Sequence, residues 1–150
     1  MSIRDTMPSL FAHAGEWEGV YTHLARDGML LDRHRTWTRC EFPSSGPHAY
    51  VQHNRLTWED GRTVERSFGG IYRDGLIHWD TERFVGYGWE TREGVLMLRL
   101  DRKDEPGVHF VETIQLAADG RTRARTWQWF EDGAPTRRTL CDEWRVASEP

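Results

Sequence analysis

The sequence predicts an all-β fold, an antiparallel up-and-down barrel of eight to ten strands with a short helical turn at its N-terminus. Five Asp-Gly pairs and Glu93-Gly94 divide the chain, and they lie between runs rich in Val, Thr, Trp, Tyr and Ile. Asp-Gly tolerates the positive φ values that tight hairpin turns require. No segment after residue 14 has helical periodicity. Because closure removes the exposed edges of such a meander, we expect a closed barrel, with a two-sheet sandwich as the alternative.

The first strand is predicted to open in Gly15-Glu16-Trp17-Glu18-Gly19-Val20-Tyr21, directly after a short apolar segment. In an extended chain Trp17 and Tyr21 fall on one face, whereas Glu16 and Glu18 fall on the other. One face is therefore aromatic and the other faces water. With the turns as boundaries, the predicted strands span 16–26, 29–42, 49–59, 62–72, 76–82, 84–91, 95–102, 108–117, 121–131 and 135–146.

Length and charge limit the classes of function. A chain of 150 residues suits one domain, residues 1–150, because it can bury one core but not two. The net charge is −4 and both signs are interleaved, which leaves no basic patch for nucleic acid. The N-terminus lacks the apolar run of a signal peptide, and no segment is apolar enough to span a bilayer. We expect a cytoplasmic protein without nucleic-acid or membrane partners, and a homodimer stays open.

The two cysteines are expected to be free thiols. Cys40 and Cys141 fall on the predicted second and last strands, which flank the first strand in a closed barrel. Two strand spacings place their backbones about 9 to 10 Å apart, beyond the reach of a disulfide.

The Gly-x-Trp motif at the start of the first strand, after a helical turn, resembles the signature of the calycins, the superfamily of lipocalin-like barrels. In that superfamily the Trp closes one end of the barrel and an Arg from the last strand lies over its ring. The resemblance gives these roles to Trp17 and Arg145. The layout Gly-x-Trp-x-Gly-x-Tyr, an Asp-Gly turn and a charged second strand is most similar to a bacterial lipocalin-like group of unknown function related to phycobiliprotein lyases. Those lyases present a bilin to an apoprotein, which is compatible with binding or catalysis, but no chromophore-specific residue can be matched here.

The turns also predict which side chains face the interior. A two-residue turn at Asp27-Gly28 would pair Arg26 with Met29, so that the inward face of Trp17 continues through His34 on the second strand. The third strand is expected to present Tyr50, Gln52, Asn54, Leu56 and Trp58 inward.

The facing of the fourth strand stays open. Val64, Arg66 and Phe68 share a face, but a two-residue turn at Asp60-Gly61 would direct that face outward. A bulge near Gly69-Gly70 would reconcile the apolar residues with the interior.

The predicted interior has the character of a small-molecule pocket, mostly apolar with a few convergent polar groups. Eight Trp could simply fill a small barrel. Filling it completely would, however, desolvate the interior polar groups at about 1–3 kcal/mol each unless they are paired. We therefore expect a planar or partly apolar ligand with a polar handle. The predicted ligand-binding residues are Tyr21, His23, Tyr50, Asn54, Trp58, Trp89, Arg99 and Trp127.

Glu112 is the candidate for catalysis, because the other residues on its face of the eighth strand are apolar. One interpretation is a buried carboxylate paired with an arginine such as Arg99, or a strand whose facing is misassigned. The other is an acid or base with a raised pKa near His34 or His78. The predicted catalytic residues are therefore Glu112, His34 and His78.

We expect neither a metal nor a cofactor. The sequence has no His-x-His, His-x-x-x-His or Cys-x-x-Cys spacing, so metal ligands could converge only from separate strands. Haem-binding calycins, the nitrobindins, take their His ligand from near the C-terminal strands, where this chain has no His after His109. A nucleophile elbow, a phosphate-binding loop and a dinucleotide motif are also lacking.

Two functions of different class follow. The first is binding of a small aromatic or hydrophobic molecule, stacked on Trp and Tyr and oriented by His, Asn and Arg. The second is a cofactor-independent lyase, isomerase or cyclase in which Glu112 or a pocket His moves a proton. Convergence of Glu112, His34 and His78 on one point would favour catalysis, whereas a structural partner for each would favour binding.

Overall fold

The computed structural model describes residues 2–146 and confirms the all-β prediction. Two helical turns precede ten antiparallel strands, each within a few residues of its predicted range. The elements are α1 (Ile3–Thr6), α2 (Pro8–Phe11), β1 (Gly15–Leu24), β2 (Leu30–Glu41), β3 (Tyr50–Thr57), β4 (Thr63–Arg73), β5 (Leu76–Asp80), β6 (Phe84–Glu90), β7 (Leu96–Arg102), β8 (Val108–Leu116), β9 (Thr122–Glu131) and β10 (Ala134–Arg145).

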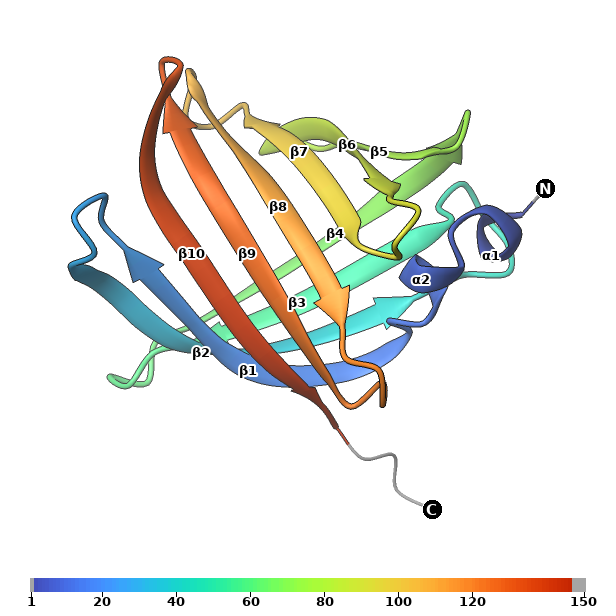
Figure 1. Cartoon of the computed structure of the whole chain (residues 1–150), viewed down its shortest axis with the longest axis horizontal. Coiled ribbons are helices and arrows are strands. Elements are labelled where there is room, and N and C mark those ends of the chain that lie inside the picture. The colour runs from blue at the N-terminus through green and yellow to red at the C-terminus, as the bar shows by residue number, and fades with distance from the viewer. Residues whose placement is uncertain (1, 147–150) are drawn as a thin grey trace.

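The strands form a closed barrel and not a two-sheet sandwich. Each strand pairs with its neighbours in the chain, and β1 also pairs with β10 to close the sheet (Figure 1). Along β9, alternate residues from Arg123 to Trp129 are buried inside the barrel while those between them are more exposed. This period of two along the strands separates a buried interior from a wet exterior.

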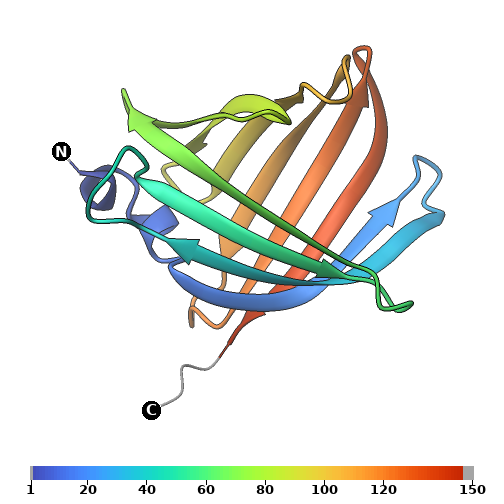
Figure 2. The same ribbon diagram turned by 180° about the vertical axis from the view of Figure 1, so that it is seen from behind.

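The two helical turns cover one end of the barrel (Figures 1 and 2). Met7 and Leu10 are buried there against the core. The backbone N–H groups of Ser9 and Leu10 donate to the carboxylate of Glu90 at the end of β6, over 3.0 and 3.2 Å. Within residues 2–146, no helix has the length and apolarity needed to cross a membrane.

Trp17 and Arg145 have the positions that the calycin resemblance implies. Trp17 is fully buried, and the Arg145 guanidinium lies 4.3 Å from the centre of its ring. Arg145 also donates to the carbonyl oxygens of Ala12, Ala14 and Gly120. The last strand is thereby fastened to the segment that precedes β1.

The turn between β1 and β2 differs from the prediction, although the predicted facing of β2 is confirmed. Ala25 pairs with Met29 across a three-residue turn, because Gly28 N–H donates to the Ala25 carbonyl and Ala25 N–H donates to that of Met29. One register shift next to His23 then restores the alignment, so that His23 lies opposite Asp32. The longer turn and the shift compensate each other.

The bulge proposed near Gly69-Gly70 is wrong. The pairing of β3 with β4 has no register shift from Thr57 to Tyr50. The turn is again three residues long, since Trp58 N–H donates to the Arg62 carbonyl, and this extra residue directs the face of Phe68 inward. Gly70 instead makes room, because a Cβ there would lie 2.6 Å from Ile77 and 2.9 Å from the Trp79 indole nitrogen.

The cysteine prediction is confirmed. Cys40 on β2 and Cys141 on β10 lie on the two strands that flank β1, and both are free and buried. Cys40 accepts a hydrogen bond from the Tyr50 hydroxyl over 3.3 Å.

Candidate functional site

The interior of the barrel holds a cavity of about 330 Å³. Aromatic and aliphatic side chains form most of its wall, with Met7 and Leu10 closing it at the helical end. Of the residues predicted to form the site, those that line this cavity are Tyr21, His23, His34, Tyr50, Asn54, Trp89, Glu112 and Trp127.

Trp58 contacts the site from its edge. Its ring stacks on His34 with the ring centres 4.3 Å apart, and its indole N–H donates to the Asp32 carboxylate. Trp58 therefore helps to position two polar groups of the site.

Two predicted residues, His78 and Arg99, lie on the outer face of the barrel. His78 stands between Ile77 and Trp79, both of which are buried inside, so its own side chain faces outward. Arg99 is exposed and lies 3.5 Å from Asp101 on the same outer face. The period of two that directs Leu98 and Leu100 into the interior sends Arg99 outside. Neither residue contributes to the cavity wall, and their predicted inward placement is wrong.

The partner of Glu112 is Arg125 on β9, and not Arg99. Arg125 Nε donates to the Glu112 carboxylate over 3.1 Å. The Arg125 guanidinium also lies 4.6 Å from the Trp127 ring centre and 5.6 Å from that of Tyr21. Alternation along the strands could have placed Glu112 and Arg125 on inward faces of adjacent strands, but their pairing follows from the register between β8 and β9.

A second ion pair extends this network toward the closed end of the barrel. Arg123 contacts Glu143 through two bonds of 2.8 and 3.2 Å, and Arg125 lies 3.5 Å from the same carboxylate. Arg123 also lies over Trp17, at 4.6 Å from the ring centre. Two guanidiniums and two carboxylates thus form one buried chain of charges of alternating sign.

The two carboxylates of this network have opposite pKa shifts. Burial raises the pKa of Glu112, although Arg125 lies beside it. Burial also acts to raise the pKa of Glu143, but the guanidiniums of Arg123 and Arg125 outweigh it, so that the pKa lies below its usual value. Glu143 is therefore the anion that holds both arginines.

Glycine at position 19 makes room for this network. A Cβ on Gly19 would lie 2.6 Å from the Cγ of Glu143 and 2.3 Å from the carbonyl oxygen of Asp142. The Gly-x-Trp-x-Gly motif thus admits the Glu143 side chain across the first strand.

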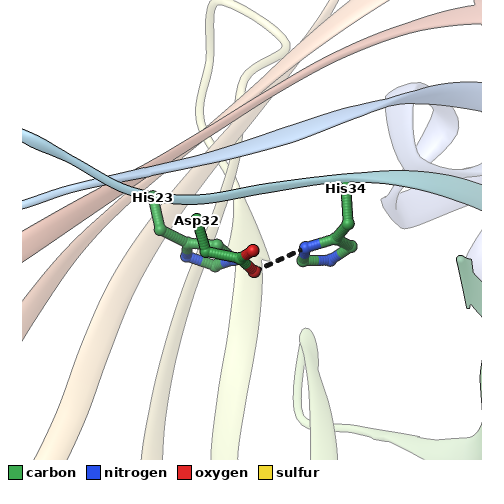
Figure 3. A group of neighbouring side chains, drawn as sticks. All are labelled: His23, Asp32 and His34. Carbon is green, nitrogen blue, oxygen red and sulfur yellow. Dashed lines mark hydrogen bonds and ion pairs between the residues drawn. The ribbon is translucent and has the colours of Figure 1, made fainter. Parts of the chain in front are cut away.

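A second polar group lies at the opposite end of the cavity, near the turn between β1 and β2. Asp32 Oδ2 lies 2.9 Å from His34 Nδ1, and His23 Nδ1 lies 2.8 Å from the Thr139 hydroxyl (Figure 3 draws the His23, Asp32 and His34 side chains). Thr139 also accepts a bond of 2.9 Å from the Trp129 indole N–H. These bonds fix the orientation of both imidazoles.

The pKa values in this group follow from burial and hydrogen bonding. Burial, reinforced by the neighbouring His34, lowers the pKa of His23 to about 4, so that its imidazole is neutral at pH 7. Burial opposes ionisation of Asp32, but the hydrogen bonds from Trp58 and His34 bring the pKa of Asp32 below its usual value. The neutral imidazole of His23 and the carboxylate of Asp32 therefore lie opposite each other on the paired strands β1 and β2.

Three arginines that the sequence reasoning missed also line the cavity, namely Arg83, Arg102 and Arg137. Arg102 lies 2.8 Å from Asp104, and Arg83 lies 3.6 Å from the same carboxylate. The Arg137 guanidinium lies 4.2 Å from the Trp129 ring centre. Alternation along β10 could have identified Arg137, because Thr139 and Cys141 share its face.

The polar groups of the site have separate structural partners. Glu112 is bound by Arg125, His34 is oriented by Asp32, and His78 lies outside. The apolar wall and the separate polar groups suit the binding and orientation of a small molecule.

Comparison with known proteins identifies the fold. No protein-family model and no curated protein sequence matches this chain. An S-type phycobiliprotein lyase, CPES from Guillardia theta, superposes with a TM-score of 0.75 at 14% identity, over 99% of this chain and 95% of that one. Rv2717c from M. tuberculosis superposes with a TM-score of 0.65 at 13% identity, over 95% of this chain and 98% of its own.

A larger protein contains the same architecture. A protein of unknown function from the DUF3598 family of Nostoc punctiforme PCC 73102 superposes with a TM-score of 0.70 at 20% identity. The superposition covers 91% of this chain, which spans about half the length of that protein, 49%. The chain therefore shares the barrel fold of these three proteins, one of which is a phycobiliprotein lyase, and a barrel of this kind is what the resemblance of its sequence implied.

Proposed function

We propose that the protein binds a small, mostly apolar and aromatic molecule inside its barrel, with a polar group of that molecule directed toward Arg137. The observation that carries this proposal is the cavity of about 330 Å³, which is lined by aromatic and aliphatic side chains and by a few fixed polar groups. Tyr21 and Trp127 offer flat faces for stacking, and their ring centres lie 5.4 Å apart.

The buried charges support binding more strongly than proton transfer by Glu112. A carboxylate held by Arg125 at 3.1 Å is engaged in a structural bond. Arg137 offers a cation for the polar handle, because its guanidinium lines the cavity and is held over Trp129. An anionic oxygen of the ligand would suit this position.

The first experiment is native mass spectrometry of freshly purified protein, repeated after denaturation. A small molecule that leaves on unfolding would identify the ligand class.

In parallel, the protein is titrated with 1-anilinonaphthalene-8-sulfonate, an aromatic probe with an anionic group, in the presence of EDTA. We expect saturable binding by the wild-type protein.

Matched variants locate the probe. Leu98→Trp fills the cavity from β7, whereas Arg99→Trp places the same ring on the outer face one residue later. We expect Leu98→Trp to abolish probe binding and Arg99→Trp to retain it. Equal affinities in the two variants, with both folded by circular dichroism, would exclude the cavity as the binding site.

A second candidate function is cofactor-independent proton transfer, as in a lyase, isomerase or cyclase. The observation that favours it is the pair of Asp32 and His34, in which a carboxylate orients an imidazole that lines the cavity. Such an enzyme would exchange a carbon-bound proton of a co-purified ligand with solvent. Uptake of deuterium from D2O that is lost in His34→Gln and retained in Glu112→Gln would support this function over simple binding.

A further inference from the structure

Three potential metal ligands converge at the end of the cavity next to the turn between β1 and β2. His23, Asp32 and His34 each offer one ligating atom, and these atoms lie within 4.8 Å of one another. His23 comes from β1, and Asp32 and His34 from β2, where the pairing places Asp32 directly opposite His23. Figure 3 shows the Asp32 carboxylate directed toward the His34 imidazole.

We propose that His23, Asp32 and His34 bind one divalent transition-metal ion, with its remaining coordination positions open to the cavity. Two imidazoles and one carboxylate are ligands of catalytic zinc and of non-haem iron. At metal–ligand distances of about 2.0–2.2 Å, ligand atoms in a tetrahedral site lie roughly 3.4 Å apart, so atoms within 4.8 Å of one another need only a modest adjustment. Asp32 can supply this movement, because 40% of its side chain is exposed.

The surroundings of the three residues have the features of an outer ligand shell. Thr139 lies 2.8 Å from His23 Nδ1 and is itself held by the Trp129 indole, so the other ring nitrogen of His23 is left for the metal. The indole N–H of Trp58 donates to both oxygens of Asp32, over 3.1 and 3.2 Å. Such bonds orient ligands and are typical of protein metal sites.

The charges of the site select the occupant of the open positions. Asp32 supplies one negative charge, and Arg137 lines the same cavity with a positive one. A bound divalent ion therefore carries uncompensated positive charge toward the interior. An anionic oxygen of the bound molecule would complete the coordination. Only this last step rests on the proposed binding function, because the three protein ligands can be tested with the metal alone.

The test uses tag-free protein that has been stripped with EDTA and returned to chelator-free buffer. It is titrated with Co2+, followed by its visible absorption, and with Zn2+, followed by calorimetry. We expect one equivalent of each ion to bind. His23→Ala, His34→Ala and Asp32→Asn should each weaken Zn2+ binding at least tenfold and remove the cobalt absorption bands.

His53→Ala is the matched control. His53 also lies beside a carboxylate, 3.2 Å from Glu41, but on the outer face of the barrel. The His53→Ala variant should bind Co2+ and Zn2+ as the wild type does. The absence of saturable metal binding by the wild type would overturn the proposal. So would a loss of metal affinity in His53→Ala as large as that in the ligand variants, or cobalt absorption bands that persist in a folded double variant of His23 and His34.

A measurement on the wild-type protein avoids dependence on the folding of variants. Zinc should shift the imidazole 15N resonances of His23 and His34 and leave those of His53 and His109 in place. Shifts confined to the outer histidines would contradict the site. Because the aromatic probe is titrated in EDTA, failure of metal binding and failure of ligand binding are separate results.

Discussion

Arg125 reaches across from β9 to donate to the carboxylate of Glu112 on β8, and both side chains are almost completely shielded from water. The same guanidinium lies 3.5 Å from Glu143, which also holds Arg123. The network therefore connects one wall of the cavity to the closed end of the barrel. A buried pair of this kind is costly to break, because one partner is left charged without compensation.

Removal of Arg125 is expected to destabilise the protein strongly. Arg125→Met should lower the free energy of unfolding by about 3–5 kcal/mol, because Glu112 and Glu143 lose a shared cation in a buried site. Glu112→Gln should cost far less, since burial already raises the pKa of Glu112 and Gln can still accept the bond from Arg125. Urea unfolding monitored by tryptophan fluorescence measures both.

The double variant Glu112→Leu with Arg125→Met provides the control for this pair. Replacing both charges by apolar groups is expected to recover part of the stability lost in Arg125→Met alone. A double variant as unstable as the sum of the two single changes would show that the pair is not coupled.

Acid sensitivity is expected to arise in part from His13. Its side chain is 1% exposed, and burial, followed by the charge of Arg123, lowers the pKa of His13 from 6.5 to about 3. The unfolded chain therefore binds a proton that the folded chain does not between these two values. The contribution of His13 to stability is complete above pH 6.5, falls progressively as the pH drops below 6.5, and is fully lost once the pH has passed through about 3.

The corresponding measurement compares the free energy of unfolding at pH 7 and pH 5. In His13→Gln the loss of stability over this interval is expected to be about 2 kcal/mol smaller than in the wild type. Carboxyl groups and other histidines also titrate in acid, so the comparison of His13→Gln with the wild type isolates the contribution of His13. An identical pH dependence in the two proteins would show that His13 is not held neutral by the fold.

Arg145 is expected to stabilise the barrel through its planar guanidinium. Its nitrogens donate to the backbone oxygens of Ala12, Ala14 and Gly120 while the same group lies over Trp17. A lysine ammonium cannot reach all three carbonyls, so Arg145→Lys should lower the free energy of unfolding by about 1–3 kcal/mol. Arg138→Lys, at an exposed position of the same strand, should be nearly neutral. Equal effects of the two substitutions on the urea midpoint would contradict this role of Arg145.

The sequence could predict the barrel because each part of it is encoded locally. Asp-Gly pairs mark the turns, and alternation within strands separates Trp17 from Glu16 and Glu18. What alternation could not supply was the number of residues in each turn. The same Asp-Gly dipeptide forms a three-residue turn before Arg62 but a two-residue turn at Asp74, where φ is 54°. One extra residue reverses the facing of the next strand.

The candidate site could be predicted in part for the same reason. Residues on strands with clear alternation, such as Tyr50 and Trp127, line the cavity. The outward facing of His78 and Arg99 could not be predicted in this way. Strands β5 and β7 carry large side chains on both faces, so the composition of each strand did not determine which face is inward. The pairing of Glu112 with Arg125 depends on the register between β8 and β9, which joins Ile114 to Arg125 and is set only when the barrel closes.

The two cysteines are expected to be inert in the folded protein. Cys40 and Cys141 are at most 2% exposed, and burial raises the pKa of the Cys141 thiol well above its ordinary value. Burial slows attack on both thiols, and because the thiolate is the reactive form, the raised pKa slows it further at Cys141. Treatment with 5,5′-dithiobis(2-nitrobenzoic acid) at pH 8 should therefore release no thiolate from native protein over an hour and two equivalents in 6 M guanidinium chloride.

Arg125→Met should react faster than the wild type, since reagent reaches these thiols only through opening of the barrel, and the reaction rate then follows the loss of stability. Rapid reaction of one equivalent in the native wild type would instead mean that a path for reagents leads from the cavity to Cys40, and that the closed end is more permeable than the packing around Trp17 implies.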